Sequence, residues 1–359
     1  MKLLVIIIIV FHFLTGFSSL GDELLSVVVL FRHGDRTPIK SYRYDHYDES
    51  YWPLGYGQLT KIGKRQQYAL GRSLRKRYDG LLPEKYDPRD ILVQSSNFDR
   101  CLMSAAANLA GLYPPRDHQV WLEGLAWQPI PIHTAPEEED AVLAQKRPCP
   151  RYDKLYDELM ATDEIQDIGW DYLEFFDFLS ANSGEKIDSF DQLKDLYDTL
   201  YVEDLHNLTL PVWTRQVFSE LAQLSDFAWS TYTFTVELAR LRTGPLVDYI
   251  TSHFENVTTD PDNALKFLML SAHDSTIANL LSSLNVFDGR WPPYASSVIF
   301  ELRKGPVTPF VNLFYDNTVE IANITLANCR FNCDLSEFRE IVAPVRMNLA
   351  RWREECLQV

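Results

Sequence analysis

The chain of 359 residues carries 34 basic and 50 acidic side chains, a formal net charge of -16, and 46% hydrophobic residues. This composition is typical of a folded globular protein with one large or two smaller domains, and it excludes the disordered and fibrous classes. Nucleic acids and anionic membrane surfaces are bound by basic faces, so the acidic balance predicts that neither is a partner.

The N-terminal segment combines one lysine with an apolar run from Leu3 to Leu14, followed by small residues up to Gly21. The run is short for a membrane span and has the flanks of a secretory signal peptide, so we expect residues 1–21 to be removed. A retained signal anchor is the alternative, but too few residues precede the first strand to form a linker. No later run is long enough to span a bilayer. We therefore expect a secreted chain without a stable membrane anchor, with the lysosomal lumen as the alternative.

A short β-branched apolar run from Leu24 to Phe31 predicts a strand buried on both faces. It is followed directly by charged residues, a glycine and a proline, in the order Arg32-His33-Gly34-Asp35-Arg36-Thr37-Pro38. In open α/β sheets, the loops at the carboxyl ends of strands line the crevice in which ligands bind. This loop is therefore a candidate ligand site.

The residues of this loop suit a phosphoryl group. The guanidinium groups of Arg32 and Arg36 can bind phosphate oxygens in pairs and cannot lose their charge. A neutral His33 imidazole between them can attack phosphorus and form a phosphohistidine that water later hydrolyses. A surface turn with solvated charges is the alternative, but the clustering of these residue types behind a buried strand disfavours it.

Two more apolar runs are followed by groups that can bind phosphate. The run 91–95 precedes Arg100, and the run 265–270 precedes His273 and Asp274. Because the carboxyl ends of parallel strands meet at one edge of a sheet, we expect all these side chains to line one crevice.

The remaining pattern predicts an α/β fold with a mostly parallel central sheet flanked by helices and a smaller helical insertion domain. Residues 60–78 have a helical stripe, and the basic run 72–77 near its end suits the negative end of a helix dipole. Helical spacing at residues 152–162, 190–205 and 214–242 predicts an insertion domain at 136–241 within an α/β domain formed by 22–135 and 242–359. Residues 297–302 and 310–315 predict a hairpin at the sheet edge.

Cysteines and sequons give further expectations. Five cysteines are an odd number, so at least one is free or pairs between chains, and the close spacing of Cys329 and Cys333 permits a small ring. Behind a signal peptide, the sequons predict glycosylated surface positions at Asn207, Asn256 and Asn323.

The loop from Arg32 to Pro38 resembles the RHGxRxP signature of the histidine acid phosphatases, the family that includes the prostatic and lysosomal enzymes. The resemblance extends over nearly the whole chain, with further matching stretches that begin at Ser96, Trp127, Asn207, Ser271 and Pro292. It implies a histidine-phosphatase-like fold and a cofactor-independent acid phosphatase that hydrolyses small orthophosphoric monoesters.

The resemblance also implies a role for each matching residue. His33 corresponds to the phosphorylated nucleophile, and Asp274 corresponds to the proton donor to the leaving alcohol. The phosphate-binding side chains would be Arg32, Arg36, Arg100 and His273. A bound phosphate dianion would raise the pKa of Asp274, which predicts an acidic pH optimum.

No metal is expected, because the arginines supply the positive charge and the acidic run 137–140 has no histidine partner. We interpret Asp35 as a partner of an arginine or a backbone amide that holds the loop. The aromatic-rich stretch 42–56 is expected either to line the mouth of the cleft or to pack structurally.

In the family, the cysteines that match Cys149 and Cys356 are bridged, as are those that match Cys329 and Cys333. Cys101 would then be a buried thiol, with a redox-sensitive group as the alternative. Relatives form homodimers, so the resemblance implies a homodimer as a possible assembly, but no patch in the sequence identifies an interface. The alternative functions are a phytase, which needs a more basic pocket, a phosphoglycerate-type mutase, which the signal peptide contradicts, and a catalytically silent secreted binding protein.

Overall fold

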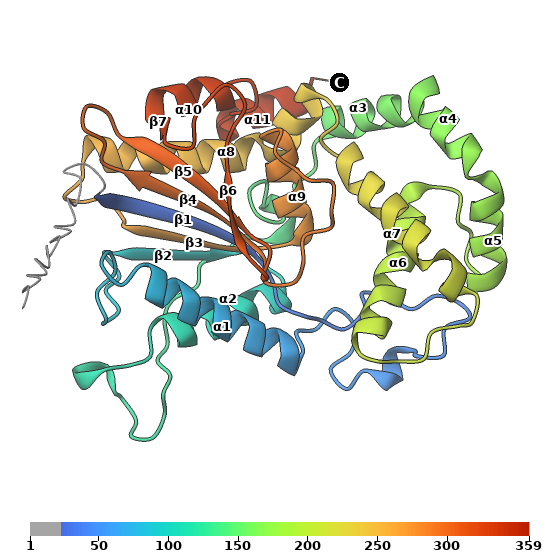
Figure 1. Cartoon of the computed structure of the whole chain (residues 1–359), viewed down its shortest axis with the longest axis horizontal. Helices are drawn as coiled ribbons and strands as arrows, with labels where there is room; N and C mark the ends of the chain where they lie inside the picture. Colours follow the sequence, from blue (N-terminus) through green and yellow to red (C-terminus); the bar gives the residue numbers. More distant parts are fainter. Residues whose placement is uncertain (1–22, 359) are drawn as a thin grey trace, which may run out of the picture.

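The computed structural model describes residues 23–358, so the expected signal peptide lies outside the described residues. A seven-stranded sheet has the order β2-β3-β1-β4-β5-β6, and β7 pairs with β5 (Figure 1). The strands are β1 (Leu24–Arg32), β2 (Ile91–Ser95), β3 (Phe267–Ala272), β4 (Ser297–Arg303), β5 (Phe310–Asp316), β6 (Ile321–Ile324) and β7 (Cys333–Asp334).

The predicted α/β class with flanking helices is confirmed, and the sheet is mixed. Strands β2, β3 and β1 are parallel to one another, whereas the pairings of β1 with β4 and of β5 with β4, β6 and β7 are antiparallel. Antiparallel pairing is therefore more extensive than the sequence predicted. The parallel part contains the three apolar runs that precede the candidate site residues.

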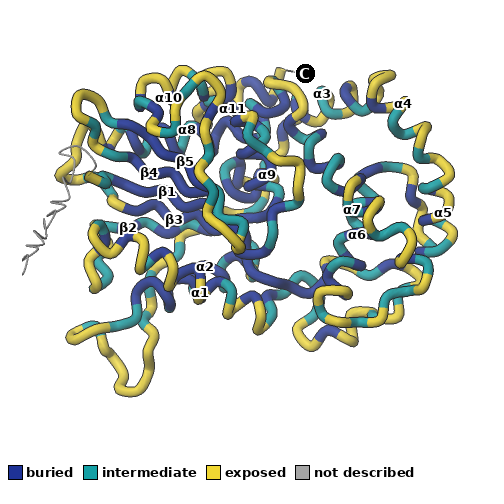
Figure 2. Tube along the Cα trace, viewed as in Figure 1, coloured by how far each residue is buried: buried dark blue, intermediate teal, exposed yellow. Residues whose placement is uncertain are grey.

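Helices cover both faces of the sheet, and β1 is buried on both. Val28 and Leu30 pack in a core with α8, α9 and α10, whereas Val27, Val29 and Phe31 pack in a core with α1 and α2. Figure 2 shows this central strand as buried along most of its length, and it is fully buried from Ser26 onward. The helices on the sheet are α1 (Lys61–Arg77), α2 (Asp99–Leu112), α8 (Val236–Thr259), α9 (Asp274–Ser283) and α10 (Leu335–Val342), and α11 (Leu349–Cys356) packs outside them against α8.

The helix predicted over residues 60–78 is confirmed as α1. Thr60 caps its N-terminus, because the Thr60 hydroxyl oxygen accepts the backbone N–H of Gly63 at 3.1 Å. The helix packs closely on α2 at Gly71, where an added Cβ would lie 2.0 Å from the Asn108 carbonyl oxygen. Glycine at this position therefore permits the close packing of the two helices.

A second group of helices lies beside the sheet, to the right in Figure 1, and has its own apolar core formed mainly by α5, α6 and α7. These helices are α3 (Pro150–Met160), α4 (Asp163–Asp171), α5 (Leu173–Ser183), α6 (Phe190–Leu205) and α7 (Thr214–Thr231). Within residues 23–358, no helix has the length and apolar character needed to cross a bilayer.

Two predicted elements differ from the structure. The helical segment 214–242 is broken after Thr231, and α8 begins at Val236, where the Thr235 hydroxyl accepts the N–H of Leu238 at 3.1 Å. The hairpin of β4 and β5 is not at the sheet edge, because β4 pairs with β1 along its whole length and residues 321–324 add β6 outside β5. The short strand β6 has little apolar alternation and gave no sequence signal.

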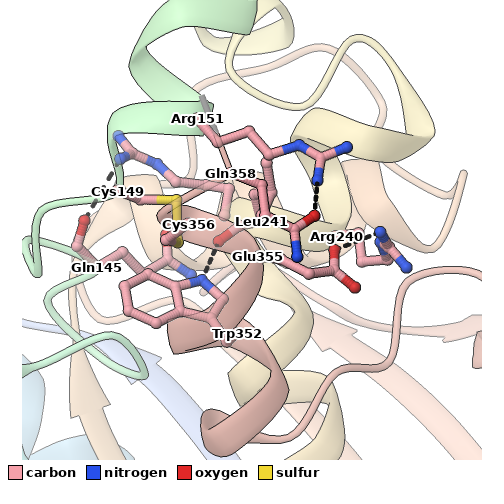
Figure 3. Close-up of a disulfide and its surroundings, with 10 residues drawn as sticks. Gln145, Cys149, Arg151, Arg240, Leu241, Trp352, Glu355, Cys356 and Gln358 are labelled. Carbon is pink, nitrogen blue, oxygen red and sulfur yellow. Dashed lines mark hydrogen bonds and ion pairs between the residues drawn. A yellow bond between two sulfur atoms is a disulfide. The ribbon is translucent and has the colours of Figure 1, made fainter.

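Two disulfides are present, and both pairings implied by the family resemblance are confirmed. Cys149 pairs with Cys356, and Cys329 pairs with Cys333. Figure 3 shows the first bridge joining the start of α3 to the end of α11, beside Trp352, whose indole N–H donates to the Leu241 carbonyl oxygen at 2.6 Å. This bridge ties the C-terminal helix to the middle of the chain.

The Cys149–Cys356 bridge is expected to contribute more stability than the Cys329–Cys333 bridge. The two bridges span sequence separations of 207 and 4 residues, and the loop entropy removed from the unfolded chain grows with loop length. The double substitution Cys149→Ser/Cys356→Ser should lower the free energy of unfolding by about 2–5 kcal/mol. Denaturant unfolding without reductant measures this, with Cys329→Ser/Cys333→Ser as the matched control. An equal loss in both variants would contradict the expectation.

Candidate active site

The three parallel strands β1, β2 and β3 end at the same level, so the predicted residues that follow them lie at one edge of the sheet. Arg32 is in register with Ala272, and the next backbone N–H, that of His33, donates to the Ala272 carbonyl oxygen at 3.0 Å. In the same way Ser95 is in register with Ser271, and the N–H of Ser96 donates to the Ser271 carbonyl oxygen at 3.0 Å. The loops that follow β1, β2 and β3 therefore leave the sheet side by side.

These loops line a cavity of about 360 Å³. Five of the six predicted site residues line it, namely His33, Arg36, Arg100, His273 and Asp274. The ring centroids of His33 and His273 are 5.7 Å apart. The sixth residue, Arg32, is bonded to Asp274 at the base of the site. The structure therefore brings all six residues into one site.

The His33 imidazole is buried, and its tautomer is fixed by a backbone contact. Nδ1 donates to the Gly34 carbonyl oxygen at 2.8 Å, so the neutral ring carries no proton on Nε2. Burial lowers the pKa of His33 well below its ordinary value, and the charges of Arg100, Arg32 and Arg36 lower it further. Without a bound ligand, these contacts therefore favour the neutral form of the imidazole.

The turn after β1 depends on a close approach to α1. An added Cβ on Gly34 would lie 2.4 Å from the Gly63 carbonyl oxygen, and one on Gly63 would lie 2.2 Å from the Asp35 carbonyl oxygen. Both contacts are with rigid backbone. Glycine at both positions therefore lets the loop that carries His33 rest against the start of α1.

Arg32 is 1% exposed and is held from several sides. Its Nη2 atom lies 2.7 Å from Asp274 Oδ2, and its Nη1 donates to the Pro292 carbonyl oxygen at 2.5 Å. The guanidinium carbon lies 3.9 Å from the centroid of the Tyr294 ring. The positive charge of Arg32 is thus fixed against the base of the site, where Asp274 partly neutralises it.

Asp274 is the first residue of α9, and three groups contact its carboxylate. Besides Arg32, the Trp291 indole N–H donates to Oδ2 at 3.1 Å, and the Ser275 backbone N–H donates to Oδ1 at 2.7 Å. Burial alone would raise the pKa of Asp274, but the charge of Arg32 and then that of Arg36 hold it well below its ordinary value. Without a bound ligand, this carboxylate is therefore ionised.

Arg36 forms a two-point ion pair that the sequence did not predict. Its Nη2 and Nη1 atoms donate to the Asp198 carboxylate oxygens at 2.8 Å and 3.1 Å. Asp198 lies in α6, so this pair joins the loop after β1 to the helices beside the sheet. Two of the three arginines of the site thus have carboxylate partners.

Arg100 and His273 contact each other. The Arg100 Nη2 donates to His273 Nδ1 at 3.4 Å, so the proton of the neutral His273 ring lies on Nε2, which donates to the Ser96 hydroxyl at 2.9 Å. Burial, and then the charge of Arg100, lower the pKa of His273 to about 3. Near neutral pH, His273 is therefore a hydrogen-bonding group without charge.

Asp35 holds the loop, but its partners differ from those expected. Its carboxylate accepts a short hydrogen bond from the Thr60 hydroxyl, and it lies 3.1 Å from His206 Nε2 at the end of α6. The expectation of an arginine or a backbone amide as the partner was wrong, because Thr60 and His206 lie nearer to the buried carboxylate.

Cys101 is a buried free thiol beside His273. Its sulfur donates to the Ala272 carbonyl oxygen at 3.4 Å and lies within 3.8 Å of both His273 ring nitrogens. Burial raises the pKa of the thiol to about 11, so it is protonated and weakly reactive. This agrees with its interpretation as a small buried hydrophobe.

The aromatic lining of the cavity comes from other segments than the stretch 42–56. Phe98, Trp229 and Trp291 line the cavity, whereas no residue of that stretch does. Sequence reasoning also missed Asp198, which carries no local signal. It missed Trp291 as well, although Trp291 directly precedes the stretch from Pro292 that matches the family.

One group of side chains among residues 23–358 has the proximity required for a metal site, and it comprises Cys329, Cys333 and Glu337. Its two sulfur atoms are joined in a disulfide, so neither can act as a thiolate ligand. The arginines of the cavity, by contrast, offer only donors and suit an anion.

Close relatives of the chain are acid phosphatases. The lysosomal acid phosphatase of Xenopus laevis is 41% identical over 344 residues, which cover 93% of this chain and 79% of the relative. The prostatic acid phosphatase of Homo sapiens is 40% identical over 348 residues, which cover 95% of this chain and 89% of the relative.

Solved structures share the fold at much lower identity. The apo form of Hafnia alvei phytase has a TM-score of 0.70 at 18% identity, with 94% of this chain and 99% of that chain covered. The sequence of residues 23–316 matches the histidine phosphatase superfamily (branch 2). This match and the identity to acid phosphatases along most of the chain lead to one conclusion: the chain belongs to branch 2 of the histidine phosphatase superfamily.

Proposed function

We propose that the protein is an acid phosphatase that hydrolyses orthophosphoric monoesters through a phosphohistidine on His33. The observation that carries this proposal is the buried, neutral His33 imidazole in one cavity with Arg36, Arg100, His273 and Asp274. The identity to curated acid phosphatases supports the same activity.

In the first step, Nε2 of His33 attacks phosphorus, a nitrogen–phosphorus bond forms, and the bond from phosphorus to the leaving oxygen breaks. Asp274 gives its proton to that oxygen, so the product is a neutral alcohol. In the second step, water attacks phosphorus, the nitrogen–phosphorus bond breaks, and the Asp274 carboxylate takes the proton from water. The arginines and His273 stabilise the charge on the oxygens of the transferring group.

Asp274 must gain a proton before the first step, and the substrate itself promotes this. A bound phosphoryl group adds negative charge beside Asp274 and competes for Arg32, which holds the carboxylate at 2.7 Å in the ligand-free site. Both effects raise the pKa of Asp274 from its depressed value. Activity should therefore fall as pH rises through the pKa of Asp274 in the complex. In the ligand-free site, burial and the charges of Arg100, Arg32 and Arg36 favour the neutral form of His33.

We assign the helical insertion at residues 136–241 the role of a cap over the α/β domain formed by 22–135 and 242–359. Helices α6 and α7 contribute Lys194, Asp198 and Trp229 to the cavity wall. The ion pair of Arg36 with Asp198 supports this role, because it links the cap directly to the phosphate-binding loop.

The alternative functions receive less support. A binding protein without activity has no need for a neutral nucleophile and a carboxyl group on the same cavity. A phytase-like activity would need a strongly basic pocket, whereas Glu137, Asp195, Asp198 and Asp274 line this one together with its cations. Comparing inositol hexakisphosphate with simple monoesters separates the two enzyme activities.

We further propose a secreted or lysosomal glycoprotein, as the names of the lysosomal and prostatic relatives suggest. Asn207, Asn256 and Asn323 are all exposed, which leaves each sequon accessible to a glycan.

A homodimer is the expected assembly, and a projecting arm offers the surface for it. Residues 116–129 form a loop that extends away from the sheet, coloured teal-green in Figure 1 and largely exposed in Figure 2. Trp121 and Trp127 are 56% and 39% exposed on this arm, beside exposed Leu122. Large aromatic groups of this kind are enriched in protein–protein interfaces.

His33→Ala is expected to abolish turnover while leaving the fold intact. The other imidazole of the site, that of His273, has no free ring nitrogen that could attack phosphorus in its place. The loss of kcat should be roughly a thousandfold or more. Steady-state assays, together with rapid-quench detection of covalently bound phosphate, measure both effects. A purified variant with full activity, or one that still forms the covalent intermediate, would end the proposal.

Asp274→Asn is expected to slow alkyl phosphates about a hundred- to ten-thousandfold, because a poor leaving group needs the proton. p-Nitrophenyl phosphate should be affected much less, since its leaving phenolate is already stable. Parallel kinetics on the two substrates measure the difference. Equal losses on both would remove Asp274 from the role of general acid.

The same variant should lose the falling limb of the pH profile. With wild-type protein, kcat for an alkyl phosphate should decrease as pH rises through the pKa of Asp274 in the complex, because its poor leaving group needs the proton, and an amide cannot titrate there. Both proteins are assayed with the same substrate, so the ionisation of that substrate affects the two pH profiles alike. An unchanged limb in the variant would assign the titration to another group.

Replacing the two exposed tryptophans with Trp121→Ser/Trp127→Ser should convert the dimer to a monomer. Light scattering after size-exclusion chromatography measures the mass, and the exposed pair Leu54→Ser/Val307→Ser provides a control of equal apolar-to-polar change. A wild-type monomer, or a dimer that survives the arm substitutions, would exclude this surface as the interface.

A further inference from the structure

Helix α1 has a basic exposed face, although the chain as a whole is acidic. Its 17 residues, Lys61–Arg77, include seven basic side chains and no acidic one. Gly63, Gln67, Leu70 and Leu74 are buried against the rest of the protein. The exposed side carries most of the basic residues, namely Lys61, Lys64, Arg65, Arg72, Lys76 and Arg77. The basic run at 72–77 therefore belongs to a larger exposed basic face on this helix.

The first five of these residues form a continuous strip, here called the α1 basic strip. Positions 61, 65, 72 and 76 follow the spacing of one helix face, and the strip runs about 22 Å along the axis at 1.5 Å per residue. At its C-terminal end lies a surface cavity of about 550 Å³ lined by Arg72, Arg75, Lys76 and Arg116 among others. In Figure 1 the helix lies on the outer side of the sheet, where solvent reaches it.

The strip is not neutralised by neighbouring carboxylates. Across residues 23–358, no ion pair within 4 Å involves Lys61, Lys64, Arg65, Arg72 or Lys76. By contrast, the two arginines at the margin are paired, Arg75 with Asp79 and Arg77 with Glu301. The charges of the α1 basic strip are therefore available to an external anion.

Helix stability does not explain this arrangement. The interaction with the helix dipole accounts for basic residues in the last turn, but Lys61, Lys64 and Arg65 lie at the opposite, positive end, where they are unfavourable. The pairs Lys61–Arg65 and Arg72–Lys76 also place like charges four residues apart, which destabilises a helix. The repulsion between these charges thus lowers the stability of the helix, and a bound polyanion would offset this loss.

We infer that the α1 basic strip binds a sulfated polysaccharide. A narrow row of cations on one helix matches a linear polyanion, and the arginine forks suit sulfate oxygens. The secreted or lysosomal location proposed above would expose the strip to such polymers, so this part of the inference rests on the proposed function. A flat anionic membrane fits less well, because acidic Asp79 and Glu84 border the strip.

This site is separate from the candidate active site. Helix α1 contacts the loop of His33 through the Gly63 backbone, on its buried side, whereas the α1 basic strip faces solvent. Polysaccharide binding is therefore expected to proceed whether or not phosphate esters are hydrolysed. It would localise the protein on a sulfated matrix while the cavity stays open.

The test is chromatography of the full-length protein on immobilised heparin at pH 7, with bound protein eluted by salt. Four strip charges are removed in one variant, Lys64→Gln/Arg65→Gln/Arg72→Gln/Lys76→Gln. A matched control removes two lysines and two arginines from other exposed positions, Lys154→Gln/Lys186→Gln/Arg215→Gln/Arg353→Gln. Both variants change the net charge equally, and the control positions lie away from the strip. Of these, Lys186 is paired with Asp188.

Wild-type and control proteins are expected to need salt above 0.15 M, roughly the physiological ionic strength, for elution, and the strip variant to elute at about half their salt concentration or less. The heparin affinity of the strip variant should fall tenfold or more. If counterion release follows the rule for nucleic acids, the slope of log affinity against log salt should decrease by about three for four lost contacts. Turnover of p-nitrophenyl phosphate should be unchanged in both variants.

Equal retention of the strip variant and the control would overturn the inference, and so would a wild-type protein that passes through the column. Binding of phosphatidylserine vesicles or duplex DNA in preference to heparin would assign the strip to another polyanion and would equally reject it. If the fourfold variant fails to fold, Lys64→Gln/Arg65→Gln and Arg72→Gln/Lys76→Gln are compared separately. Each should then show about half of the shift in elution.

Discussion

The parallel pairing of β1 with β3 is the constraint on which the site depends. It places Arg32 level with Ala272, and the next hydrogen bond, from the His33 N–H to the Ala272 carbonyl oxygen, spans 3.0 Å. A shift of one residue in this register would turn His33 to the other face of the sheet. The burial of β1 on both faces opposes such a shift, because each alternate side chain has its own core to fill.

Charge compensation is the second principle of the site. Buried guanidinium groups are costly unless they are paired, and Arg32 and Arg36 have Asp274 and Asp198 as partners. In the proposed mechanism, a substrate phosphate would enter a site whose positive charge is partly neutralised already. It would redistribute these contacts and so return a proton to Asp274. The depressed pKa of the free carboxyl group is thus compatible with the proposed role of Asp274 as an acid.

The distribution of charge carries more information than its sum. The net charge of -16 conceals α1, which has no acidic residue and an exposed strip of unpaired cations. It also conceals the cavity, where arginines and lysines alternate with carboxylates from the helices beside the sheet. An averaged composition correctly indicates a folded globular protein, but it does not describe any single face of the molecule.

The sequence by itself determined the strand Leu24–Arg32, the loop that follows it, the helix Lys61–Arg77 and the six residues that meet at the cavity. It could do so because apolar runs, caps and the spacing of Arg and His are local signals. The break between α7 and α8, the place of β4 beside β1, and the partners Asp198 and Trp291 were decided only by the tertiary structure. These features depend on which distant segments pack together, and the free energy of such packing is not encoded in any short stretch of residues.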